Sequence, residues 1–313
     1  PAVADVSSST ADGTYGVGAV IAITVTFSEP VTVTGTPQLT LETGAADAAV
    51  DFSGGSGTAT LTFSYTVAAG HTSPDLDYVG TAALALNSGT IKDAAGNGST
   101  LTLPEPGAPH SLGDNKALVI DGIVPTVALS STSPDPTGTG PIPVMAEFSE
   151  AVTGFTIRDI TVTNGTADAF TGSGADYIFE VTPTGQGTVT VEIAAGVCQD
   201  TTGNANVAAT PLSRVYDTEA PTVALSTAAP DPTGTSPIPV TATFGEAVTG
   251  FAVGDVTVAN GTAGGFGGSG ASYSFEVTPA GQGTVTVQIA AGVCEDAAGN
   301  DNFEALEALD LEL

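Results

Sequence analysis

Basic and aromatic side chains are scarce in this chain. Its 313 residues include 4 Lys and Arg, 2 His and no Trp, whereas 34 Asp and Glu give a formal charge of −30. Such a surface repels nucleic acid and anionic membranes, so we expect neither as a partner. The lack of Trp disfavours a carbohydrate-stacking platform. The acidity indicates either a solvated surface suited to a salty habitat or carboxylates placed to bind metal.

Cysteines and long apolar segments are also few. Cys198 and Cys294 are 96 residues apart, the period of the repeat described next. In an extended array they would be about 40 Å apart by strand rise. A disulfide needs Cα atoms within about 7 Å, so we expect two small buried side chains instead. No signal peptide or membrane-spanning run is evident. The start at Pro1, inside a linker-like motif, predicts a fragment of a longer repeat protein.

Much of the chain consists of two copies of one sequence repeat. Residues 125–216 recur at 221–312 with a constant offset of 96 and no insertion. A fixed period marks a repeat array, and this period suits a small β-domain better than a solenoid unit. The longer first segment keeps the same landmarks, so we predict domains at 1–121, 122–217 and 218–313. Linkers ending in Pro125 and Pro221 argue against freely swinging domains.

The apolar pattern predicts an all-β fold. Apolar and polar residues alternate along 144–148, 177–181 and 189–193, the period of half-buried strands. Asn164-Gly165 and Asn260-Gly261 stand between apolar runs and predict hairpin turns. Several short strands in about 95 residues predict an immunoglobulin-like Greek-key sandwich. We therefore expect three such sandwiches in an extended tandem array.

Enzyme chemistry has little support, and we expect no enzyme. His71 and His110 both belong to the first domain, where no nucleophile motif accompanies them. No glycine-rich phosphate loop opens a helix.

Three motifs carry a resemblance to a known family. They are Phe148-Ser-Glu-Ala-Val-Thr-Gly-Phe155, Asp-Xaa-Xaa-Gly-Asn at 200–204 and the Asp-Xaa-Xaa-Xaa-Pro linker at 121–125, each with a copy 96 residues later. They resemble the bacterial Ig-like repeats of large RTX/BapA-like surface adhesins. The resemblance covers the second and third domains. It implies an extracellular β-sandwich array at the bacterial cell surface, often stiffened by calcium between domains.

The acidic residues of these motifs should converge where the chain enters each sandwich, because the B–C, D–E and F–G loops share that end. Three carboxylates within about 5 Å repel by about 3 kcal/mol per pair at an effective dielectric of about 20, and the motifs hold no Lys or Arg. Hard oxygen ligands in a flexible site favour Ca²⁺ over Mg²⁺. Alternatively, Asp-Xaa-Xaa-Gly-Asn is only a turn and each Glu a loop cap. The predicted ligands are Asp121, Glu150, Asp200 and Asn204 at the first junction, and Asp217, Glu246, Asp296 and Asn300 at the second.

The first domain holds a partial copy of this set. Glu29, Asp93 and Asn97 occupy the same places, but the incoming linker is cut off, which predicts an incomplete site. Asp75 and Asp77 precede strand F at the exit end and would add ligands to the first junction.

These observations favour a spacer. We expect a monomer whose neighbours are further Ig-like repeats of the same longer chain, forming the extension of a bacterial surface adhesin. One alternative is an adhesion module that binds a host or surface glycan or protein, most plausibly through the longer first domain. Another is an accessory region of a secreted polysaccharide-acting enzyme.

Overall fold

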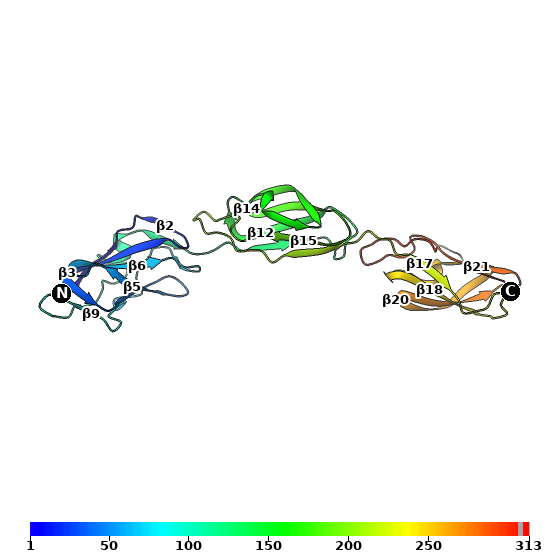
Figure 1. Cartoon of the computed structure of the whole chain (residues 1–313), viewed down its shortest axis with the longest axis horizontal. Helices are drawn as coiled ribbons and strands as arrows, with labels where there is room; N and C mark the ends of the chain where they lie inside the picture. Colours follow the sequence, from blue (N-terminus) through cyan, green and yellow to red (C-terminus); the bar gives the residue numbers. More distant parts are fainter. Residues whose placement is uncertain (306–308, 313) are drawn as a thin grey trace.

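The computed structural model shows three lobes in a line, joined by thin linkers (Figure 1). It describes residues 1–305 and 309–312. Each lobe has a separate hydrophobic core, formed between Val6 and Ile120, between Val127 and Ala209, and between Val223 and Leu311. The predicted extended array of three β-sandwiches is confirmed.

The first domain is the largest and least regular of the three. Its larger sheet has the order β1-β3-β6-β5-β4-β8, with β9 pairing β3, and its smaller sheet is β2-β10-β7. A short helix, α1 (Leu112–Asn115), precedes β10. The strands are β1 (Val3–Ser8), β2 (Gly13–Tyr15), β3 (Val20–Thr34), β4 (Gln38–Leu41), β5 (Ala48–Gly54), β6 (Thr58–Thr66), β7 (Thr72–Ser73), β8 (Leu84–Ala85), β9 (Thr90–Lys92) and β10 (Leu118–Asp121).

The second and third domains share one topology. In each, two three-stranded sheets face one another, β11-β12-β14 against β13-β15-β16 and β17-β18-β20 against β19-β21-β22. A short 3₁₀ turn precedes β13 and β19, namely η1 (Ile157–Asp159) and η2 (Val253–Asp255). The strands are β11 (Val127–Ser130), β12 (Ile142–Val152), β13 (Ile160–Thr163), β14 (Gly165–Pro183), β15 (Gly187–Ile193), β16 (Leu212–Tyr216), β17 (Val223–Ser226), β18 (Ile238–Val248), β19 (Val256–Ala259), β20 (Gly261–Pro279), β21 (Thr284–Ile289) and β22 (Leu309–Glu312).

The alternating strands bury the side chains that the sequence predicts. Val144, Ala146 and Phe148 of β12 are all buried, as are the matching positions of β14 and β15. Phe148 meets Phe155 and Tyr177 edge to face at the centre of this core.

The Asn-Gly pairs do not form hairpin turns, so that prediction is wrong. Asn164 does adopt the left-handed conformation, at φ 57°, but the strand before it pairs with β15 and the strand after it belongs to the other sheet. The pair is a corner between sheets. Within β14 the backbone of Gly172 lies against that of Asp176, since a Cβ at Gly172 would meet the Asp176 carbonyl oxygen.

Both cysteines are buried and unpaired, as predicted. Burial raises the pKa of each thiol to about 11, with Asp159 adding to the effect at Cys198 and Asp255 and Asp301 at Cys294. Cys198 and Cys294 are therefore small core side chains and not reactive thiols.

Candidate metal centre

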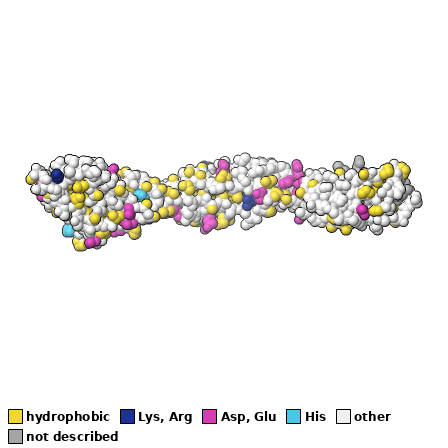
Figure 2. Space-filling view, turned by 90° about the horizontal axis from the view of Figure 1, so that it is seen from below, with side chains coloured by type: hydrophobic (Ala, Val, Ile, Leu, Met, Phe, Trp, Pro, Cys, Tyr) yellow, Lys and Arg dark blue, Asp and Glu magenta, His cyan; other side chains and the backbone are white. Residues whose placement is uncertain are grey.

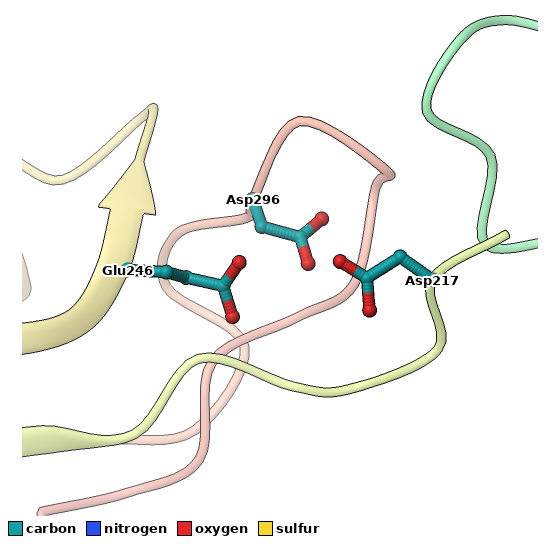
Figure 3. Close-up of side chains that lie close together, drawn as sticks. All are labelled: Asp217, Glu246 and Asp296. Carbon is teal, nitrogen blue, oxygen red and sulfur yellow. The ribbon is translucent and has the colours of Figure 1, made fainter. Parts of the chain in front are cut away.

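Three carboxylates meet at the junction of the second and third domains. Asp217, Glu246 and Asp296 each offer an oxygen, and these oxygens lie within 4.8 Å of one another. Figure 3 shows the side chains pointing toward one another from three separate segments. Among the described residues, no other three acidic, histidine or cysteine side chains come this close.

Local backbone structure aims two of the three carboxylates. Glu246 lies where the pairing of β18 with β20 changes register, between Thr243 and Val248. Such a bulge reorients side chains at a strand end. Asp296 opens the loop after β21, and its Oδ1 accepts hydrogen bonds from the backbone N–H groups of Ala298 (2.8 Å) and Asn300 (2.9 Å). This turn is the one that Asp-Xaa-Xaa-Gly-Asn predicts.

The linker supplies the third carboxylate. The N–H of Asp217 donates to the carbonyl of Thr137 in the second domain at 3.0 Å, which fixes the end of β16. Its Oδ1 accepts from the N–H of Glu219, also at 3.0 Å. Asp217 therefore enters the site from a restrained linker.

Asn300 connects the linker to the acidic loop. Its side-chain nitrogen donates to the carbonyl of Asp217 and to Oδ2 of Asp296, both at 2.9 Å. Its oxygen lies against Gly138 of the second domain, at 2.7 Å from where a Cβ would be. The side-chain nitrogen therefore faces the linker and the acidic loop, and the role of Asn300 as a metal ligand stays a prediction.

The electrostatics of the site favour a bound cation. Asp296 is only 4% exposed, and Asp217 and Glu246 are half-buried. Burial raises the pKa of Glu246, and the neighbouring charges of Asp296, Asp217 and Glu219 raise it further. Within the described residues, no ion pair includes any of the three carboxylates of the site.

Two of the chain's four Lys and Arg side chains, Lys116 and Arg214, have partners elsewhere. Lys116 pairs with Asp12 at 2.7 Å. The guanidinium of Arg214 donates to the carbonyl oxygens of Ser131, Ser133 and Ser213. Figure 2 shows acidic side chains spread along the rod and gathered near the boundary of the second and third domains.

The first junction has the same plan, but its linker carboxylate has a different partner. Oδ1 of Asp200 accepts from three backbone N–H groups of its own loop, and Asn204 donates to the carbonyl of Asp121 and to Oδ2 of Asp200, both at 2.8 Å. The hydroxyl of Thr202 donates to Oδ2 of Asp121 at 2.7 Å. At the second junction the matching residue is Ala298, which has no hydroxyl. Asp121 is therefore held by Thr202, whereas Asp217 faces the other carboxylates.

Glu150 still lies in an acidic environment at the first junction. Burial raises its pKa, and the charges of Asp200 and Asp121 raise it further. Its Oε1 is buried without a hydrogen-bond partner. Oδ1 of Asn204 accepts from the N–H of Val17 in the preceding domain at 2.6 Å, whereas Oδ1 of Asn300 lies beside Gly138 of its preceding domain.

The predicted ligands of the first domain are bound locally. Glu29 pairs with the amine of Pro1 at 3.1 Å. Asp93 accepts two hydrogen bonds from Asn97, at 2.7 and 2.8 Å, which also lower its pKa. Asp93 and Asn97 thus repeat the turn of the later domains.

Asp75 and Asp77 do not join the first junction, which corrects the expectation from sequence. Asp77 accepts from the N–H groups of Tyr78, Gly107 and Gly113 at 2.9–3.1 Å. An Oδ2 of Asp75 lies near the same Gly113. Both carboxylates thus face α1 inside the first domain.

Sequence reasoning missed the glycines on which successive domains meet. A Cβ at Gly16 would be 2.7 Å from Oδ1 of Asn204, and one at Gly138 equally close to that of Asn300. The N–H of Gly138 also donates to the carbonyl of Ala298 at 3.0 Å. In sequence each is an ordinary glycine between two strands, Gly16 before β3 and Gly138 before β12, so nothing local indicates a contact with the next domain.

The linkers are further held by the domain that precedes them. Gly122 exchanges backbone hydrogen bonds with His71 and Gly70, both at 2.7 Å. At the second junction, the side-chain amide of Gln186 accepts from the N–H of Thr218 (3.0 Å) and donates to its hydroxyl (3.1 Å). Each linker is thus bonded on both sides.

Fold and junctions together define a tandem array of Ig-like sandwiches with acidic sites between domains. The sequence profile of the bacterial Ig-like domain family matches residues 121–215 and 217–312, more than half of the chain. The chain belongs to that family, as its motifs indicate. A search of curated protein sequences gave no match. No described helix has the length and apolar character needed to cross a bilayer.

Solved structures of similar proteins include multidomain adhesins and Ig arrays. Invasin, a bacterial integrin-binding protein, is 11% identical with a TM-score of 0.33, over 91% of this chain and 56% of that one. The Yersinia pseudotuberculosis adhesin InvE is 16% identical with a TM-score of 0.22, over 60% and 58%. The I67–I69 fragment of titin is 12% identical with a TM-score of 0.27, over 99% and 98%. The chain thus spans little more than half of either bacterial structure.

Proposed function

We propose that this chain is an extension segment of a bacterial surface adhesin, stiffened by Ca²⁺ between its domains. The observation that carries the proposal is the cluster of Asp217, Glu246 and Asp296, gathered without a counter-charge. At 4.8 Å and an effective dielectric of about 20, each ionised pair repels by about 3 kcal/mol. The lack of a counter-charge at this domain boundary supports a bound cation that neutralises the cluster.

The chemistry of the cluster suits Ca²⁺. This ion takes about 6–8 oxygen ligands in flexible geometry, whereas Mg²⁺ requires a tighter octahedron. Asp217, Glu246 and Asp296 would supply carboxylate oxygens, and backbone carbonyls and water would complete the shell. An extracellular module of this kind binds Ca²⁺ at about 10⁻⁴–10⁻³ M.

The placement of the ligands gives the ion a mechanical role. Asp217 belongs to the linker, whereas Glu246 and Asp296 belong to the third domain. The loop that holds Asp296 also contacts Gly138 of the second domain through Ala298. A bound ion would tie linker, loop and both domains into one unit, which is what a spacer under load requires.

The first junction is the weaker candidate for a metal site. Thr202 engages Asp121 in a charge-assisted hydrogen bond, so a cation would have to compete with that hydroxyl. Asn204 and Val17 already connect the first and second domains without an ion. We therefore propose that hydrogen bonds mainly hold the first junction together, whereas the second junction depends on the metal.

The same features support an extracellular location. Linear arrays of Ig-like domains hold a binding region away from a surface, and the acidic exterior keeps such a rod soluble. We propose that the chain lies outside the cell, at the bacterial surface, as a monomeric segment between other repeats of one longer protein.

Isothermal titration of the whole chain with CaCl₂ tests the proposal. Glu246→Gln keeps the shape and removes one charge, and we expect it to abolish the tighter binding event. Glu150→Gln makes the matching change at the first junction and should leave that event intact. Equal Ca²⁺ binding by wild type and Glu246→Gln would contradict the site.

A further inference from the structure

The outer face of the β11-β12-β14 sheet differs in character from the same face of the third domain. Met145 of β12 lies directly opposite Ile178 of β14, and both side chains are on the solvent side of the sheet. Ile178 is 56% exposed. The equivalent pair in the third domain is Thr241 opposite Ser274. The two domains share a fold, so folding alone does not require the apolar pair.

The next cross-strand pair also differs between the two domains. Glu147 lies opposite Asp176, two exposed carboxylates on neighbouring strands. Like charges in this position destabilise a sheet. The third domain has Thr243 opposite Ser272 instead. The second domain thus carries both an exposed apolar pair and a repulsive acidic pair where its twin has four small polar residues.

The apolar pair lies in a groove of about 350 Å³. Pro143 and Ala169 also line it, Glu180 is at its rim, and Ala169 adopts a left-handed conformation at φ 49°. The third domain has Gly265 there, with φ 56°. A side chain in this conformation is strained, so the alanine methyl adds apolar surface at the expense of stability.

We infer that this face docks a polypeptide segment of another protein that combines an apolar side chain with flanking Lys or Arg residues. The apolar groove would receive the apolar side chain, and the carboxylates of Glu147, Asp176 and Glu180 would pair with the basic ones. This function is additional to the proposed spacer role and does not depend on metal binding.

Charge decides among the candidate occupants. A second copy of this chain has a net charge of −30 and only 4 Lys and Arg, so it would be repelled. Nucleic acid is excluded for the same reason. A glycan would lack a stacking surface, because the one aromatic side chain in the lining, Phe179, is 2% exposed.

The chain contains a reporter for this face. Met145 is the only methionine, so labelling with methyl-¹³C methionine gives one NMR signal, from inside the groove. The probe is a synthetic capped peptide with two Leu residues flanked by Lys and Arg, titrated into the whole chain. One control peptide replaces the basic residues by Glu, and the other replaces Leu by Ser.

We expect the basic, apolar peptide to shift the Met145 signal saturably at up to millimolar concentration. Ile178→Ser, which copies the third domain, should weaken binding by about tenfold, the scale of one buried aliphatic side chain. Glu147→Thr/Asp176→Ser should weaken it several-fold and reduce its salt dependence. The control peptides should bind weakly or not at all.

A graft keeps the inference testable if a loss-of-binding variant misfolds. Thr241→Met, Thr243→Glu, Ser272→Asp and Ser274→Ile transfer the face to the third domain, and should give a second methyl signal that the peptide also shifts. Any of three results would overturn the inference. They are a Met145 signal that shows no saturable shift, equal binding of the Glu-containing peptide, and wild-type affinity in Ile178→Ser.

Discussion

Replacing Ala298 by Thr should convert the second junction into a copy of the first. At the first junction the hydroxyl of Thr202 donates to Oδ2 of Asp121 at 2.7 Å, whereas Ala298 leaves Asp217 facing Glu246 and Asp296. A hydrogen bond to a charged group contributes about 1.5–3 kcal/mol. Ca²⁺ would have to displace that bond, so its affinity should fall by about 10- to 100-fold.

Ala298→Val is the matched control, because Val has nearly the shape of Thr but no hydroxyl. Titration calorimetry should show weak binding only for the Thr variant, while in chelator the same variant should melt at a higher temperature than wild type. The reverse change, Thr202→Ala, should release Asp121 and strengthen Ca²⁺ binding at the first junction. If the Thr and Val variants bind Ca²⁺ equally, the hydroxyl does not explain the difference between the junctions.

Three further outcomes follow from the structure. The raised pKa of Glu246 means that the folded chain holds this proton more tightly than the unfolded chain, so in chelator the melting temperature should fall as pH rises above the ordinary 4.5; Glu246→Gln should flatten that slope. Gly138→Ala should loosen the second junction, because its Cβ would lie 2.7 Å from the amide oxygen of Asn300. The control is Gly234→Ala, whose Cβ meets nothing within 4 Å. Limited proteolysis should cut the linker of the Gly138→Ala variant faster than that of the control. Cys198 and Cys294 should resist a polar thiol reagent at pH 8, since burial raises each pKa to about 11, and should react after denaturation; rapid labelling of the native chain would contradict their burial.

Much of the fold could be predicted because its signals are periodic. The alternation at Val144, Ala146 and Phe148 fixes the inward face of β12 whatever the strand order is. Asp217, Glu246 and Asp296 repeat the spacing of Asp121, Glu150 and Asp200, and their loops predicted that the three carboxylates meet at one end of the sandwich. Each of these sequence patterns recurs 96 residues later, and a pattern that recurs at a fixed spacing is less easily explained by chance.

Other features depend on geometry that local sequence does not encode. Asn164-Gly165 is typical of a hairpin turn, but whether the next strand pairs with the previous one or crosses to the other sheet is set by the whole sandwich. An asparagine side chain can offer oxygen or nitrogen, and only its two acceptors, the carbonyl of Asp217 and Oδ2 of Asp296, show which way Asn300 points. The exchange of Thr202 for Ala298 looks minor in sequence, yet it changes what the linker carboxylate faces.

Small-angle X-ray scattering of the whole chain, in Ca²⁺ and in chelator, tests the central claim that the ion stiffens the rod. Three domains in line should span roughly 110–140 Å by strand rise. We expect an extended, narrow profile with Ca²⁺, and a shorter, broader one in chelator, where repulsion among Asp217, Glu246 and Asp296 opens the second junction. Glu246→Gln in Ca²⁺ should not gain the extra stiffness of wild type. Identical profiles for wild type in both conditions would contradict the account.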